Sequence, residues 1–126
     1  MLDRRRDPRT DPHASLRNLL RVRAERHGLG LAVVSTADGV LVAGSREDRP
    51  ARRAAAHAAH EVRRGASFVR EGSGARLRGV RVDYAGGPLV IAVLEQQAGP
   101  AAESVLAGLA ERIGAILSEL RRRAAA

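Results

Sequence analysis

The residues best suited to chemistry form one short pattern, His57-Ala58-Ala59-His60-Glu61. Two histidines three residues apart on a helix can share a metal ion, as they do in some helical bundles. The pattern matches neither HExxH nor HxxEH, and the sequence indicates no third ligand nearby. We therefore expect an exposed or interfacial histidine pair, with no metal site.

Two other stretches resemble catalytic or nucleotide-binding motifs. Gly72-Ser73-Gly74 contains Gly-x-Gly, but it lacks the GxGxxG spacing and precedes a strand, whereas a phosphate loop needs a following helix. Ser35 and Ser73 have no His and acid at a readable spacing. Asp38-Gly39 is a hairpin turn signal. The sequence therefore predicts no catalytic residue, no bound cofactor and no enzyme activity.

The 126-residue chain is strongly basic, with 22 basic residues against 14 acidic ones and a net charge of +8. All the basic residues are arginine, and alanine, glycine and valine are abundant, which suggests a coding bias. We interpret the arginines mainly as solvated surface, secondly as a dock for an acidic protein, and lastly as contacts to nucleic acid or anionic lipid. With 2% aromatic residues, a stacking platform for single strands is not expected.

Composition also bounds the class of protein. The chain has no cysteine, which excludes disulfides, thiolate chemistry and Cys-ligated zinc. No apolar run approaches the roughly 18 residues of a membrane helix, and the first residues lack the apolar core of a signal peptide. We expect a cytoplasmic protein with residues 1–11 as a disordered tail, one domain over 12–122, and a short tail over 123–126.

Hydrophobic periodicity predicts the element order α-β-β-α-β-β-β-α. The first helix begins after Asp11 and has Gly28 as its C-cap. Strands follow at 29–35, 40–43, 67–70, 76–84 and 88–94, and further helices at 50–64 and from 100 onward. Short links between strands make the sheet antiparallel. In the strand at 76–84, the apolar residues Val80, Val82 and Tyr84 occupy even-numbered positions, whereas Leu77 occupies an odd-numbered one. This change suggests a bulge near Gly79.

The second predicted helix has an inner face of very small volume. Its apolar positions recur at helical spacing, and all but one are alanine: Ala51, Ala54, Ala55, Ala58, Ala59 and Val62. Small side chains let another helix or a sheet approach closely. Four arginines, Arg52, Arg53, Arg63 and Arg64, make the same helix strongly basic.

The element order, the hairpin AVVSTADGVLVAGS and the strand PLVIAVLE before an amphipathic helix resemble the roadblock / dynein light chain family. The resemblance covers roughly residues 12–122 and points to the bacterial GTPase-regulator type. It implies an α+β fold, a three-layer α/β/α sandwich with a five-stranded antiparallel sheet between one helix and a pair. It also implies homodimers, formed where the second helices pack together and the sheets join through the third strand. Family members bind Ras-like GTPases or motor subunits.

The resemblance assigns a dimer or partner interface to the second helix and the third strand. The expected interface residues are Arg52, Ala54, Ala55, Ala58, Ala59, Val62, Arg63, Phe68 and Val69. The sequence thus predicts a non-enzymatic interaction module that regulates a small GTPase or scaffolds a larger assembly. A small-molecule sensor with a profilin-like sheet and a weak nucleic-acid binder stay open as alternatives.

Overall fold

The computed structural model describes residues 12–63, 65, 67–72, 75–84, 87–95 and 101–125. The described elements follow the predicted order: α1 (Pro12–Arg26), β1 (Leu31–Thr36), β2 (Leu41–Gly44), α2 (Arg49–Glu61), β3 (Ser67–Gly72), β4 (Ala75–Tyr84), β5 (Gly87–Glu95) and α3 (Ala101–Ala125). The predicted tail at 1–11 and the N-cap at Asp11 lie outside the described residues. Helix α3 continues to Ala125, through the position where the sequence predicted the domain to end.

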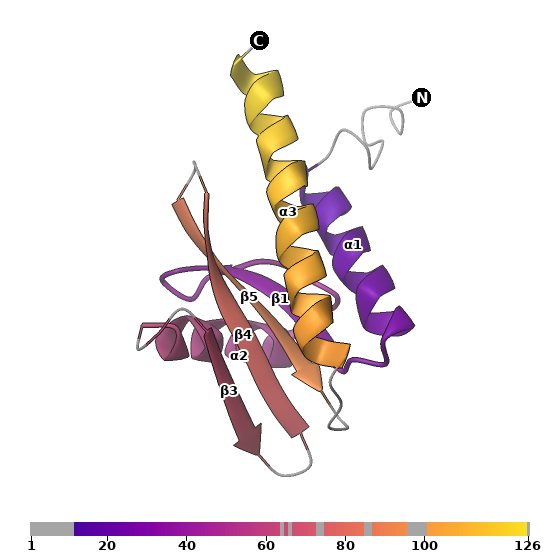
Figure 1. The fold of residues 1–126 in the computed structure, drawn as a ribbon, viewed down its shortest axis with the longest axis vertical. Helices are drawn as coiled ribbons and strands as arrows, with labels where there is room; N and C mark the ends of the chain where they lie inside the picture. Colours follow the sequence, from indigo (N-terminus) through magenta and orange to yellow (C-terminus); the bar gives the residue numbers. More distant parts are fainter. Residues whose placement is uncertain are drawn as a thin grey trace.

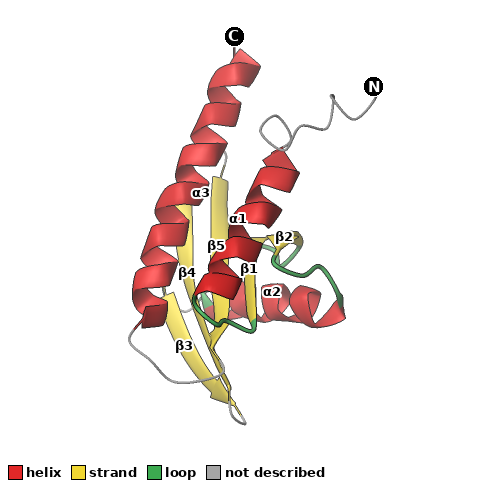
Figure 2. Cartoon of the chain, turned by 90° about the vertical axis from the view of Figure 1, so that its right-hand side faces the viewer, coloured by secondary structure: helices red, strands yellow, loops and turns green. Residues whose placement is uncertain are grey.

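The five strands form one antiparallel sheet in the order β2-β1-β5-β4-β3. Helix α2 covers one face, and helices α1 and α3 lie side by side on the other (Figures 1 and 2). The predicted three-layer α/β/α sandwich is therefore confirmed. None of the described helices is long and apolar enough to cross a membrane.

The two central strands explain the unbroken apolar runs in the sequence. Alternate residues of a strand point to opposite faces, so a strand covered on both faces is apolar at every position. Along β1 and β5, one set of residues contacts α1 and α3, and the other contacts α2. The first set is Ala32, Val34, Ile91 and Val93, and the second is Leu31, Val33, Val90 and Ala92.

The same two-sided burial overturns the predicted bulge near Gly79. Strand β4 pairs with β5 without a register shift from Arg76 to Tyr84. Leu77 packs in the cluster on the α2 side, whereas Val80 packs on the side of α1 and α3. Because both faces of β4 are covered, a regular strand can carry apolar residues at odd and at even positions. No bulge is needed to explain the sequence.

Helix α1 ends at Gly28, as the sequence predicts. Gly28 has a left-handed φ of +63°. Its N–H donates to the Glu25 carbonyl at 3.4 Å, and the Leu29 N–H donates to the Ala24 carbonyl at 2.9 Å. These two bonds are the Schellman arrangement, which satisfies carbonyl groups that the helix end leaves free.

The hairpin between β1 and β2 differs from the expected two-residue turn. The Gly39 N–H donates to the Thr36 carbonyl at 3.0 Å, and the Thr36 N–H donates to the Val40 carbonyl at 2.9 Å. Of the loop residues Ala37 to Gly39, only Gly39 has a positive φ, at +93°. The loop therefore has three residues with glycine last, the common alternative to a primed two-residue turn.

Candidate functional site

Helix α2 and the neighbouring strand β3 carry the residues that the sequence assigned to an interface. Helix α2 begins where Asp48, in extended conformation, accepts a hydrogen bond from the Ala51 N–H at 3.2 Å. Pro50 follows within the first turn, where its missing N–H costs nothing. The helix therefore runs over Arg49–Glu61 and is shorter at its end than the predicted 50–64.

The inner face of α2 packs on the sheet of its own chain. Ala55 and Ala58 have no exposed surface, Ala59 and Val62 are buried, and Ala54 lies at the edge of the same cluster. Small side chains let the helix backbone lie close to β1 and β5, as their sizes suggested. Ala55, Ala58 and Ala59, which were expected at an interface with a second copy, are thus buried within their own chain, whereas Ala54 keeps accessible surface.

The turn of the β1–β2 hairpin also lies against α2. A Cβ atom added to Gly39 would lie 3.2 Å from the Cα atom of Ala56 and 3.7 Å from the Cβ atom of Ala59. The Asp38-Gly39 dipeptide therefore has a structural role on this face. Ser35 is buried, and its hydroxyl donates to the carbonyl of Thr36 at 3.1 Å, which is a local contact and not a catalytic one.

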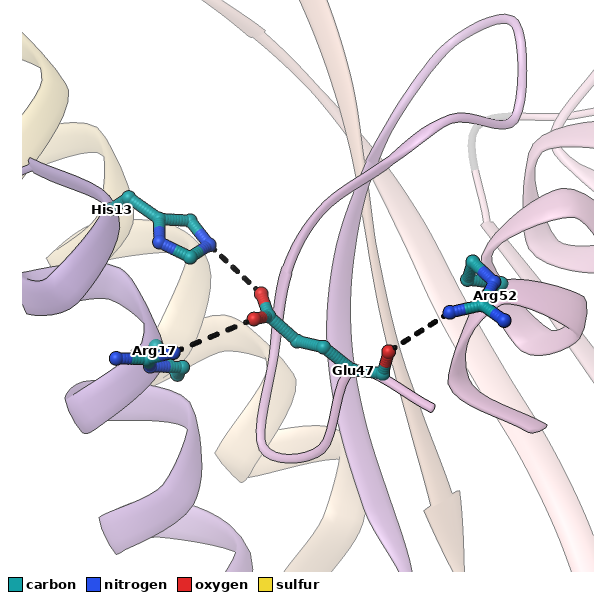
Figure 3. A network of polar contacts seen from close by, with 4 residues as sticks. All are labelled: His13, Arg17, Glu47 and Arg52. Carbon is teal, nitrogen blue, oxygen red and sulfur yellow. Dashed lines mark hydrogen bonds and ion pairs between the residues drawn. The ribbon is translucent and has the colours of Figure 1, made fainter. Parts of the chain in front are cut away.

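The link before α2 is held by one glutamate (Figure 3). The Glu47 carboxylate lies 2.8 Å from Nε2 of His13 and 3.6 Å from Nη1 of Arg17, both on α1. Its backbone carbonyl accepts a hydrogen bond from Arg52 of α2 at 3.1 Å. Glu47 thus connects helices on opposite faces of the sheet around the β2 edge.

The outer face of α2 is basic. Arg52 and Arg53 are exposed on the helix, and Arg63 is exposed just beyond its end. Arg64 lies outside the described residues. An acidic partner surface is the natural complement of such a face, because opposite charges steer encounter and fix orientation.

The histidine pattern of α2 lies beside Glu61 at the end of the helix. Nε2 of His57 lies 4.0 Å from Oε1 of Glu61, and that same oxygen accepts from Arg70 of β3 at 2.6 Å. Among the described residues, no group of three or more His, Cys, Asp or Glu side chains could hold an ion. Glu61 instead joins the end of α2 to β3.

Strand β3 is an edge of the sheet. It pairs with β4 along its whole length and has no described partner on its other side. Val69 is 49% exposed, whereas Phe68 is half-buried in the cluster beneath α2. The Phe68 ring lies over Gly79, where an added Cβ would lie 2.8 Å from Cζ of the ring.

The structure thus divides the predicted interface residues into two groups. Those on the surface of α2 and β3 are Arg52, Arg63 and Val69, with Ala54 and Phe68 partly accessible; those under α2 are Ala55, Ala58, Ala59 and Val62. Sequence reasoning missed Asp48, Glu47 and the Glu61–Arg70 pair. Aspartate two residues before a proline is a readable N-cap signal, but no sequence pattern joins His13 to Glu47.

Comparisons with known proteins give structural relatives only. No protein-family model and no curated protein matches the sequence. The fold is similar to MglB of Myxococcus xanthus, with a TM-score of 0.69 and 10% identity over 86% of this chain and 91% of that one. A structure described as MglB with tetrameric arrangement has a TM-score of 0.69 and 15% identity, over 86% and 91% of the two chains.

A third relative carries the family name itself. The Roadblock/LC7 domain from Streptomyces avermitilis has a TM-score of 0.64 and 21% identity, over 79% of this chain and 99% of that one. At these identities the likeness concerns the fold. The α-β-β-α-β-β-β-α order, the five-stranded antiparallel sheet and these matches together show that the chain has a roadblock-like fold.

Proposed function

We propose that the chain is a cytoplasmic, non-enzymatic homodimer that binds and regulates a Ras-like GTPase or scaffolds a larger assembly. The proposal rests on the roadblock-like fold and on one observation: β3 has no described partner along its outer edge, and the end of α2 is joined to β3 by the Glu61–Arg70 ion pair at 2.6 Å. The resemblance to the family links these two elements with dimerisation and partner binding.

The edge of β3 favours self-association. An edge strand presents unpaired backbone N–H and C=O groups to any other strand, and monomeric proteins usually block such edges. Here the edge bears Val69, 49% exposed, and no proline. Antiparallel pairing of two β3 strands would extend the sheet and bring the two α2 helices to the same face. The tetrameric arrangement of one MglB structure supports assembly in proteins of this fold.

The basic face of α2 favours an acidic protein surface as partner. Arg52 and Arg53 are exposed near the start of the helix, and Arg63 is exposed beyond its end. In a β3-paired dimer these arginines of the two copies would share one face, so that a single partner could contact both.

The dimer is tested by Val69→Glu, which adds a charge to the edge strand. We expect the wild type to have dimer mass in light scattering at micromolar concentration, and Val69→Glu to have monomer mass with an unchanged circular dichroism spectrum. Val40→Glu is the matched control, because Val40 is also an exposed valine, at 63%, near the opposite edge of the sheet. A wild-type monomer at every concentration would remove the homodimer.

The GTPase is tested with the purified Ras-like GTPases of the source organism, each loaded with GDP or a non-hydrolysable GTP analogue. We expect one of them to bind the dimer with a preference for one nucleotide state. Arg52→Glu with Arg53→Glu should weaken that binding and leave the dimer mass unchanged. If no GTPase binds a verified dimer, the scaffold function alone is supported.

A further inference from the structure

A second surface lies on the opposite side of the sheet, between helices α1 and α3 (Figure 2). The two helices leave a hollow of about 400 Å³ between them. Its apolar part consists of Leu19 and Val22 of α1 and Ile116 of α3. Its basic part consists of Arg23, Arg26 and Arg112. We call this surface the α1/α3 groove.

The groove follows from a second stripe on α1. Leu16, Leu20 and Ala24 recur at four-residue spacing and are buried against the sheet. Beside them, residues 15, 19, 22 and 26 recur at three- and four-residue spacing and line the groove. Residues at this spacing share one face of a helix. The groove therefore runs along α1 from Ser15 to Arg26, a length of about 17 Å at the rise of an α-helix.

No described part of the chain covers the apolar part of the groove. Val22 is 38% exposed, and Leu19 and Ile116 are only partly buried. Covering such side chains removes apolar surface from water, which favours association. The floor of the groove thus favours an apolar occupant.

The charge of the groove has no counterpart within the described residues. Arg26 and Arg112 are exposed, Arg23 is half-buried, and none of the three forms an ion pair there. Elsewhere, arginines have acidic partners: Arg17 pairs with Glu47 and Arg78 pairs with Glu95. No described acidic side chain lines the groove.

We propose that the α1/α3 groove binds an amphipathic helix of a partner protein, with leucine-like residues along one face and glutamate or aspartate at its margins. A helix laid along α1 and α3, which run in opposite directions (Figure 1), can place apolar residues at i, i+3 or i+4, and i+7 over Leu19, Val22 and Ile116. Its carboxylates then meet Arg23, Arg26 and Arg112. A nucleic acid would match the charge but leave the apolar floor uncovered.

This site does not depend on the proposed GTPase function. The groove is separated from α2 by the sheet, and its residues belong to neither α2 nor β3. A chain that binds one protein through α2 therefore keeps the groove free for a second. The module would in that case connect two partners.

Peptide display tests the proposal. A library of peptides about 15 residues long, the length of α1, is selected for binding to the full chain in roughly 150 mM salt. We expect enrichment of peptides with helical apolar spacing and a net negative charge. The best peptide, synthesised with a fluorophore, should bind in an anisotropy assay. Its counterpart with every Glu and Asp replaced by Gln and Asn should bind at least about tenfold more weakly.

Two charge-matched variants locate the binding site. Arg26→Glu with Arg112→Glu changes two exposed arginines of the groove, and we expect it to weaken the peptide at least about tenfold. Arg52→Glu with Arg53→Glu makes the same charge change on α2 and should leave peptide affinity unchanged. Val22→Asp should also weaken the peptide, because it places a charge on the apolar floor.

Several results would overturn the proposal. One is a selection that enriches no peptide or only peptides without acidic residues. Another is equal peptide affinity for the wild type and the Arg26→Glu, Arg112→Glu variant. A third is failure to bind any peptide while vesicles of phosphatidylserine and phosphatidylcholine bind through Arg26 and Arg112, which would assign the groove to a membrane surface.

Discussion

Gly39 combines two constraints at one residue of the β1–β2 hairpin. Its φ of +93° lies in the region that L side chains rarely adopt, and an added Cβ would lie 3.2 Å from the Ala56 backbone. We expect Gly39→Ala to lower the free energy of unfolding by about 1–3 kcal/mol, through backbone strain and displacement of the turn from α2. Urea denaturation followed by circular dichroism measures the change.

Substitutions at two other glycines separate the effect of backbone strain from the effect of contact with α2. Gly28 has a positive φ but no atom within 4 Å of an added Cβ, so Gly28→Ala reports strain alone. Gly72 has neither feature, and Gly72→Ala should stay within about 0.5 kcal/mol of the wild type. If Gly39→Ala costs no more than Gly72→Ala, the turn does not depend on contact with α2.

Single residues show where sequence reasoning succeeds and where it stops. Gly28 was readable as a helix end because its bonding partners lie within five residues of it. Asp38-Gly39 could be predicted as a turn from the sequence. Only the structure shows that Gly39 has a positive φ and that Asp38 does not. His13 and Glu47 are 34 residues apart, and nothing in either local sequence indicates their contact.

At the scale of elements, the alanine stripe of α2 is compatible with two packing arrangements, one against a second copy and one against the sheet of the same chain. A stripe of alanines permits close approach of any apolar surface, and the structure assigns it to the sheet of the same chain. Similarly, the shift of apolar residues from odd to even positions after Leu77 can indicate either a bulge or a strand covered on both faces. The structure shows that both faces of β4 are covered. Periodicity identifies an element and its buried face, but it does not identify what covers that face.

Overpacking tests the assignment of α2. Ala55 has no exposed surface, so Ala55→Leu should lower the free energy of unfolding by about 1–3 kcal/mol. Ala107→Leu is the matched control at an exposed alanine of α3 and should be nearly neutral. Thermal melts at several protein concentrations measure both variants, in the Val69→Glu background if the wild type is a dimer.

The concentration series distinguishes packing within the chain from packing between copies. If Ala55 packs on its own sheet, the destabilisation is the same at every concentration. A loss that grows on dilution, or that vanishes in a monomer, would place Ala55 at a contact between copies instead.

For the whole molecule, periodicity and short links predicted the element order and the antiparallel sheet, whereas the three-layer arrangement was implied by the resemblance to the roadblock family. Short links force neighbouring strands to be antiparallel, and the apolar strand before the last helix becomes the centre of the sheet. The arrangement of charge was not predictable in this way. Only the folded chain separates a basic face on α2 from the basic α1/α3 groove across the sheet, while Arg78 and other arginines pair with acids.

This distribution argues against nucleic acid as the main partner. Tight binding to a duplex needs many phosphate contacts along one surface, and each contact makes affinity fall with salt. Among the described residues, the exposed arginines that form no ion pair include Arg52 and Arg53 on α2 and Arg26 and Arg112 in the groove, on opposite sides of the sheet. We therefore expect the full chain to bind duplex DNA more weakly than about 1 µM at physiological salt, without sequence preference, in a fluorescence anisotropy titration.

A variant without the arginine clusters near the two ends of the sequence is the control for the DNA-binding measurement. Removing residues 1–11, with Arg121, Arg122 and Arg123 changed to Gln, should abolish much of the residual DNA binding and leave the melting temperature close to that of the wild type. Peptide binding at the α1/α3 groove should be unaffected, because its basic residues lie between 23 and 112. Tight binding of the shortened chain to a defined duplex, with a steep salt dependence, would instead show that the folded domain itself recognises nucleic acid.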